Sequence, residues 1–118
     1  MTTNFPGRRQ ELQIQLARLA KELPGPVDGF GRLHTESVAE GTVPAKFKEL
    51  MALAIAIAVH CEDCIAYHVH DALAAGATHQ EILETIGVAI MMGGGPAAMY
   101  ACDAYVALDQ YEKQSKAA

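Results

Sequence analysis

Apolar residues recur every three or four positions over much of the chain, which is the spacing of one face of an α-helix. The clearest case covers residues 8–23, where leucines follow one another at intervals of four, three and four. These leucines are Leu12, Leu16, Leu19 and Leu23. Pro24-Gly25-Pro26 comes next and is expected to end this first helix.

A weaker pattern over residues 27–40 predicts a second, short helix that ends at Gly41. Its expected core contacts are three apolar side chains: Phe30, Leu33 and Val38. Thr42 is expected to cap a third helix, because Pro44 fits only the first turn of a helix. That helix covers residues 45–59, and its second half is apolar on every side, which is typical of a buried helix.

Capping signals divide the second half of the chain. A helix over residues 65–75 is expected to end at Gly76, and Thr78-His79-Gln80-Glu81 is a capping box that opens the next helix. Gly93-Gly94-Gly95 interrupts that helix, and Pro96 starts a last one that reaches about residue 111. Strand-like alternation is missing from the pattern, so the sequence predicts an all-α fold. We expect one domain over residues 1–118, built as a helical bundle of five or six helices.

Composition and charge narrow the function classes. Of the 118 residues 51% are hydrophobic, and 21 are alanine, which favours helices but buries little area. Such a core is lean, so self-association is expected to complete it. The net charge of −5 argues against nucleic acid and against a polybasic membrane-binding surface. No Lys or Arg lies between Lys48 and Lys113, so the acidic character is concentrated in the second half.

The N-terminal residues are polar, and no signal peptide is recognisable. The longest apolar run is ten residues, over positions 50–59, whereas a membrane-spanning helix needs about 20. The sequence therefore predicts a cytoplasmic protein without a membrane partner.

Cys61, Cys64 and His68 are spaced i, i+3 and i+7, which places them on one side of a helix that starts near Cys61. At a helix N-terminus, free N–H groups and the positive end of the helix dipole favour a thiolate. His68 lies one turn beyond Cys64, within reach to take or hold its proton. The two cysteines are also close enough to form a disulfide, so the three residues predict a dithiol redox centre.

Glu49 is the fourth candidate. It comes early in the buried third helix, among Phe47, Leu50, Met51 and Leu53. If its carboxylate points inward, burial raises its pKa and makes it a proton acceptor near neutral pH. If it points outward, it is an ordinary exposed charge of the first turn. The spacing does not decide between the two.

The run Glu49-x11-Cys61-x2-Cys64-x3-His68 resembles the alkylhydroperoxidase D-like branch of the carboxymuconolactone decarboxylase family, over about residues 44–107. The resemblance implies an all-helical fold that assembles as a homotrimer or homohexamer. It also implies thiol-dependent reduction of hydroperoxides, with a lipoyl domain or a thioredoxin-like protein as dithiol reductant. The proton relay of the family falls on Glu49, Cys61 and His68, with Cys64 as the sulfur that reacts with peroxide.

Asp63 departs from the pattern of this branch, because many of its peroxidases have a histidine immediately before the second cysteine. A carboxylate there opposes a thiolate on Cys64 unless it points away, which lowers the expected peroxidase rate. Cys102 is expected to be a buried cysteine in apolar surroundings on the last helix. We assign no chemistry to the other histidines, although His34 could line a pocket.

Three other functions are alternatives. Cys61, Cys64 and His68 could supply three zinc ligands, with His60 or His70 as the fourth, in a metal-binding helical module. The chain could also be a decarboxylase of the carboxymuconolactone type, but lactone decarboxylases of the family typically lack the cysteine pair. A third class is an interaction protein whose paired cysteines are idle. The dithiol peroxidase is the preferred interpretation, and it requires neither a cofactor nor a metal.

Overall fold

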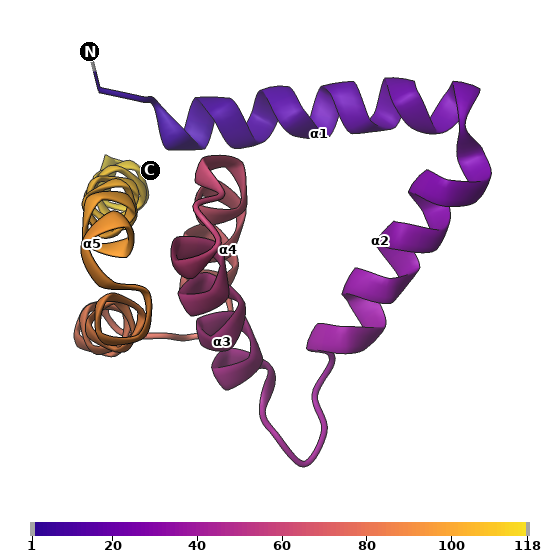
Figure 1. The fold of residues 1–118 in the computed structure, drawn as a ribbon. Helices are drawn as coiled ribbons and strands as arrows, with labels where there is room; N and C mark the ends of the chain where they lie inside the picture. The colour runs from indigo at the N-terminus through magenta and orange to yellow at the C-terminus, as the bar shows by residue number, and fades with distance from the viewer. Residues whose placement is uncertain (1, 118) are drawn as a thin grey trace.

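The computed structural model describes residues 2–117, and every regular element in that stretch is an α-helix (Figure 1). The helices are α1 (Phe5–Glu22), α2 (Pro24–Val38), α3 (Ala45–Ala58), α4 (Glu62–Ala74) and α5 (His79–Ala117). The predicted all-α bundle is confirmed. The count of five or six depends on α5, because its backbone leaves helical geometry once, at Gly94.

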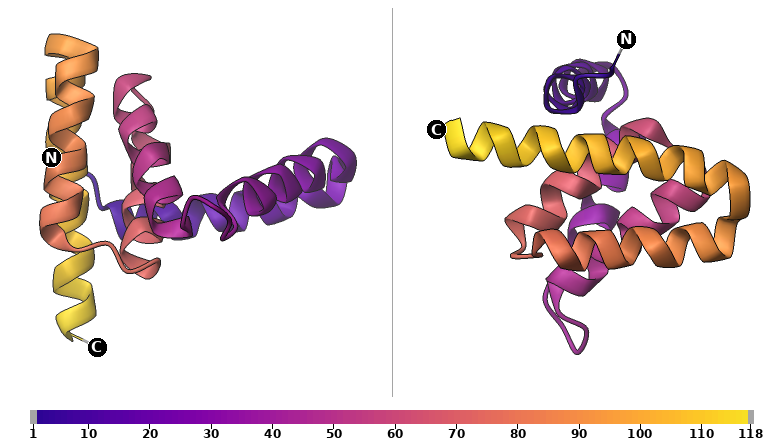
Figure 2. Two further views of the ribbon diagram at one scale, coloured as in Figure 1. Left: turned by 90° about the horizontal axis from the view of Figure 1, so that it is seen from below. Right: turned by 90° about the vertical axis from the view of Figure 1, so that its left-hand side faces the viewer.

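The C-terminal helix α5 is a hairpin of two helices. Figure 2 shows the chain reversing direction so that the second half runs back beside the first. Gly94 makes the reversal with φ 72° and ψ −154°, a conformation that essentially only glycine adopts. Pro96 then lies in the first turn of the second half, where its missing N–H is tolerated. Taken as one helix, the 39 residues are long and apolar enough to cross a membrane, but the reversal prevents one continuous span.

The core lies between α3, α4 and both halves of α5, with the first turn of α1 added at one end. Its largest fully buried side chains are Phe5, Leu53, Ile57, Ile65, Val69, Ile82 and Leu108. Of the 19 buried hydrophobic residues in the described chain, nine are alanines, so the core is as lean as the composition predicts. Tyr111 fastens the second half of α5 to α4, because its hydroxyl donates to the Ala66 carbonyl at 2.7 Å.

The helices α1 and α2 form an arm that reaches away from this bundle (Figure 1). None of the described side chains of α2 is buried. Phe30 and Leu33 are 71% and 61% exposed, so the prediction that they are core contacts was wrong; Val38 is half-buried. The apolar spacing predicted the helix, but spacing does not show whether another element covers its apolar face.

The first helix ends at Glu22, just before Pro24-Gly25-Pro26, as predicted. Pro24 also starts α2, three residues before the predicted start at residue 27, because proline is tolerated in the first turn of a helix. One prediction about a helix cap was wrong. Thr42 does not cap α3: Pro44 occupies the N-cap position, and the Glu40 carboxylate accepts the Ala45 N–H at 3.0 Å instead.

The ends of α4 and α5 agree better with the sequence. Gly76 follows α4 with φ 96°, as expected for the residue after a helix. Thr78 and Glu81 bond each other's backbone N–H groups at 3.1 and 2.9 Å, which confirms the capping box. The last helix continues to Ala117, beyond the predicted end, and an Asp109–Lys113 ion pair of 3.0 Å supports the extra turn.

Candidate active site

The cysteine pair lies where α3 turns into α4. Cys61 is the N-cap residue of α4, and its Sγ accepts the backbone N–H of Cys64 at 3.2 Å. The two sulfurs are joined in a disulfide, and the Cα atoms are 5.2 Å apart. Both cysteines are half-buried. The structure thus has the pair at a helix N-terminus, where a thiolate is stabilised when the disulfide opens.

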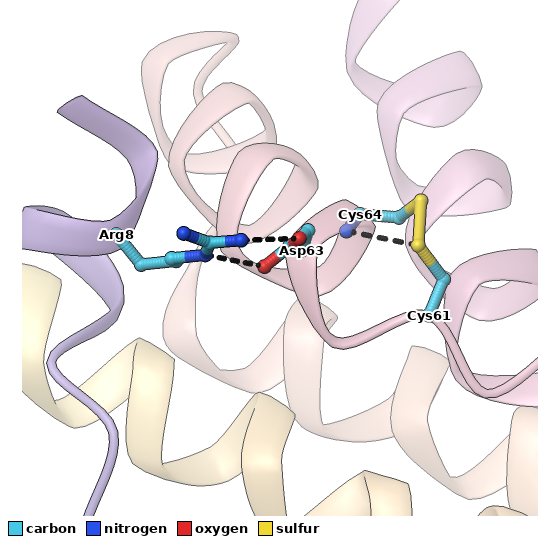
Figure 3. The surroundings of a disulfide bond; sticks show 4 residues. All are labelled: Arg8, Cys61, Asp63 and Cys64. Atoms are coloured by element: carbon cyan, nitrogen blue, oxygen red, sulfur yellow. Dashed lines mark hydrogen bonds and ion pairs between the residues drawn. A yellow bond between two sulfur atoms is a disulfide. The ribbon is translucent and has the colours of Figure 1, made fainter. Parts of the chain in front are cut away.

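Asp63 points away from the disulfide and toward Arg8 of α1 (Figure 3). Two hydrogen bonds join their side chains, from Nε to Oδ1 at 2.9 Å and from Nη2 to Oδ2 at 3.1 Å. The hydrogen bond and the charge of Asp63 raise the pKa of Arg8. The carboxylate next to Cys64 is therefore neutralised by a cation from the N-terminal helix. In this geometry its negative charge does not oppose a thiolate on Cys64.

Glu49 points inward, which is one of the two orientations that its spacing left open. It is 4% exposed, and its Oε2 lies 3.5 Å from His68 Nδ1 on α4. Burial raises the pKa of Glu49, the charge of Asp71 raises it further, and His68 opposes both. A carboxyl group in this environment binds a proton more readily than an exposed one, which suits a role as proton acceptor.

Two further residues join Glu49 and His68. The rings of His34 and His68 meet edge to face, with centroids 5.7 Å apart, so α2 contributes to the site from the arm. Asp71 lies one turn after His68 on α4. One ligand atom from each of the four side chains lies within 4.8 Å of the other three. The spacing of three residues between His68 and Asp71 could have suggested that Asp71 lies in this cluster. No local pattern relates His34 to residues of α4.

Other residues singled out from the sequence lie outside this cluster. Cys102 is exposed, so the prediction of a buried cysteine was wrong; its Sγ donates to the Ala98 carbonyl at 3.5 Å. It directly follows Ala101, a core position of α5, and one step of an α-helix turns its side chain about 100° away from the direction of Ala101. His60 has φ 62° and stacks on Tyr100, with ring centroids 4.9 Å apart.

Comparison with known proteins places this site in a family. The Carboxymuconolactone decarboxylase family model matches residues 24–107, a stretch that contains Glu49, both cysteines of the disulfide and His68. The chain belongs to the carboxymuconolactone decarboxylase family. The matched region also includes α2, and therefore His34, which the motif alone did not reach.

Relatives of this family member share most of its length. A protein of Cupriavidus necator, itself uncharacterised, is 36% identical over 109 residues, which are 92% of this chain and 96% of the relative. A carboxymuconolactone decarboxylase family protein from Legionella pneumophila superposes with a TM-score of 0.86 at 38% identity, covering 91% of this chain and 96% of that one. A carboxymuconolactone decarboxylase family protein from Thermotoga maritima, described as possibly involved in antioxidative response, superposes with a TM-score of 0.74 at 28% identity. The superposition covers 79% of this chain and 96% of that one.

Proposed function

We propose that this carboxymuconolactone decarboxylase family member is a dithiol-dependent hydroperoxide reductase of the alkylhydroperoxidase D-like branch. One observation carries the proposal: a Cys61–Cys64 disulfide at the N-terminus of α4 lies on the same helix as His68, which contacts the buried Glu49. A redox-active sulfur pair and a carboxylate–imidazole pair are the parts that peroxide reduction by thiols requires.

The reaction starts from the reduced dithiol. His68, supported by Glu49, takes the proton of Cys64, and the thiolate attacks one oxygen of the hydroperoxide. A sulfur–oxygen bond forms, the oxygen–oxygen bond breaks, and the alcohol leaves with the proton that His68 returns. Cys61 then attacks the sulfenic acid on Cys64, which forms the disulfide and releases water. The dithiol has lost two electrons and the peroxide has gained them.

The hydrogen bond from Cys64 N–H to Cys61 Sγ supports this division of roles. It stabilises negative charge on Cys61, which makes Cys61 the nucleophile for the sulfenic acid. Cys64 is one helical turn from His68, whereas Cys61 is two turns away. An external dithiol, from a lipoyl domain or a thioredoxin-like protein, then reduces the disulfide by exchange. A cytoplasmic location provides such reductants.

Peroxide consumption with a dihydrolipoyl donor tests the proposal. We expect Cys64→Ser to abolish turnover and His68→Ala to slow it by roughly 100-fold or more, because general base catalysis is lost. Cys102→Ser is the matched control, because Cys102 is exposed and outside the pair, and it is expected to keep the wild-type rate. Equal rates in all four proteins would overturn the proposal.

A brief peroxide pulse followed by sulfenic acid trapping and mass spectrometry assigns the attacking sulfur. In the Cys61→Ser protein, we expect a stable sulfenic acid on Cys64, because its partner is missing. Sulfenic acid on Cys61 in the Cys64→Ser protein, formed at the wild-type rate, would reverse the assignment.

The exposed apolar surface supports assembly as a homotrimer or homohexamer. Large apolar side chains are exposed on α1, α2, α3 and α5 of the single chain, among them Ile14, Phe30, Ile55, Met91 and Met92. A monomer rarely leaves so much apolar surface open to water. The lean alanine core points the same way, because subunit contacts would bury the larger side chains that the monomer core lacks.

A further inference from the structure

The four side chains around the buried carboxylate come from three helices and none of them is a thiol. They are His34 of α2, Glu49 of α3, and His68 and Asp71 of α4. Each places one potential ligand atom within 4.8 Å of the ligand atoms of the other three. Two imidazole nitrogens and two carboxylate oxygens therefore lie close together at one place in the structure.

Three of the four side chains that converge there have buried polar atoms without hydrogen-bond partners. Within residues 2–117, this holds for both carboxylate oxygens of Glu49, for His34 Nε2 and for His68 Nδ1. The Glu49 side chain is only 5% exposed, and its 3.5 Å approach to His68 Nδ1 does not have hydrogen-bond geometry. Leaving buried polar atoms unpaired is costly, so these lone pairs favour a common partner at the centre of the cluster.

We propose that His34, Glu49, His68 and Asp71 bind a divalent ion of the zinc class. Two neutral imidazoles and two carboxylates are ligands that zinc accepts in tetrahedral sites, and the two carboxylates balance the charge of the ion. The Asp71 carboxylate also pairs with His70 at 2.8 Å, a contact that orients it. No Lys or Arg occurs in residues 49–112, so these segments supply no ammonium or guanidinium group to take the place of the ion.

The geometry requires a small closure that α2 can provide. A tetrahedral ion with bonds of about 2.0–2.2 Å holds its ligand atoms about 3.3–3.6 Å apart, so the cluster must contract by about 1 Å. No described side chain of α2 is buried, so this helix can carry His34 inward with little loss of packing.

Metal binding would also regulate the redox site, a consequence that rests on the proposed function. The ion takes Glu49 and His68, the same two groups that move the proton of Cys64. An occupied site therefore cannot reduce peroxide by the proposed route. His34 and Asp71 contact the ion without belonging to that relay.

Titration with Co²⁺ tests the site directly, with Zn²⁺ competition against a chromophoric chelator to measure affinity. We expect one ion per chain, with visible cobalt bands and without a sulfur-to-cobalt charge-transfer band. The Cys61→Ser/Cys64→Ser protein is expected to bind like wild type. His34→Ala and Asp71→Asn are expected to weaken binding by roughly tenfold or more. The control His79→Ala, whose histidine pairs with Glu112 on α5, is expected to have no effect.

Three results would overturn the metal site: no binding, binding that depends on the two cysteines, or wild-type affinity in His34→Ala. Circular dichroism checks that each variant is folded, and His34→Ala is the safest of them because α2 has no buried residue. Added Zn²⁺ is expected to slow peroxide reduction by the wild type. If Zn²⁺ binds through these residues and the rate does not change, the regulatory role is wrong. If no protein reduces peroxide at all, the proposed function fails while the cobalt titration still decides the site.

Discussion

Replacing Gly94 by alanine tests the reversal that lets the second half of α5 return over the core. Gly94 has φ 72° and ψ −154°, and a residue with a Cβ atom is strained in that conformation whatever space surrounds it. The reversal positions Tyr100, which stacks on His60 beside the cysteine pair, and Tyr111, which bonds α4. Strain at this one residue therefore acts on the packing of the whole C-terminal half.

The expected loss of stability follows from two opposing effects. Holding alanine in this backbone conformation costs about 1–3 kcal/mol. Alanine also lowers the entropy of the unfolded chain, which stabilises the folded state by about 0.4–1 kcal/mol. The midpoints of the two ranges leave a net destabilisation of about 1.3 kcal/mol, or a fall in Tm of roughly 5 °C for a chain of this size.

Urea and thermal denaturation followed by circular dichroism, at one fixed protein concentration, measure the effect. Gly87→Ala and Gly95→Ala are matched controls, because an added Cβ at either position meets no described atom within 4 Å and neither has a positive φ. We expect these controls to be neutral or to stabilise the protein by up to about 1 kcal/mol. If Gly94→Ala is as stable as the controls, the inference that the chain reversal requires glycine at position 94 is wrong.

Three other predictions concern separate contacts. Tyr111→Phe removes the hydrogen bond to the Ala66 carbonyl and is expected to cost about 1–2 kcal/mol in urea denaturation. Burial raises the pKa of Tyr111 from 10.0 to about 12, so wild-type stability falls between those pH values as the unfolded tyrosine ionises first, and the deficit of the variant narrows there. Arg8→Gln leaves the Asp63 carboxylate unpaired and should slow iodoacetamide alkylation of reduced Cys64 several-fold at low salt. Adding Asp63→Asn to the Arg8→Gln protein should restore the alkylation rate. If Arg8→Gln does not slow alkylation, the ion pair does not affect the Cys64 thiolate. Met92→Glu places a charge on a 75% exposed apolar side chain, so light scattering should show a smaller assembly, whereas an unchanged mass would exclude this residue from the interface.

Local chemistry explains which parts of the fold could be predicted from the sequence. Capping residues, the glycine after α4 and the apolar spacing each act within a few residues, so the number and class of the helices were predictable. The same spacing predicted that α2 has an apolar face, with Phe30 and Leu33 on it. The spacing could not show that α2 belongs to an arm, because whether another element packs on the apolar face of α2 depends on residues far away in the chain.

The candidate site divides in the same way. Cys61, Cys64 and His68 lie on one helix, so their spacing predicts their relation directly. The inward orientation of Glu49 and the approach of His34 depend on how α3 and α2 pack against α4, and a single sequence does not encode that packing locally. Asp63 shows the same limit: its effect on Cys64 is decided by Arg8, a residue of another helix.

The arm connects the two unusual properties of this chain, its lean core and its buried polar cluster. The ring of His34 on α2 meets the ring of His68 on α4, yet the backbone of α2 comes close only to α1 and α3, and α2 has no buried side chain among those described. The apolar face of α2 remains open on the single chain, so a subunit that covers it would also fix the distance between His34 and His68. Assembly and the geometry of the site are then coupled through one helix, and a change that loosens the arm should weaken metal binding before it unfolds the bundle.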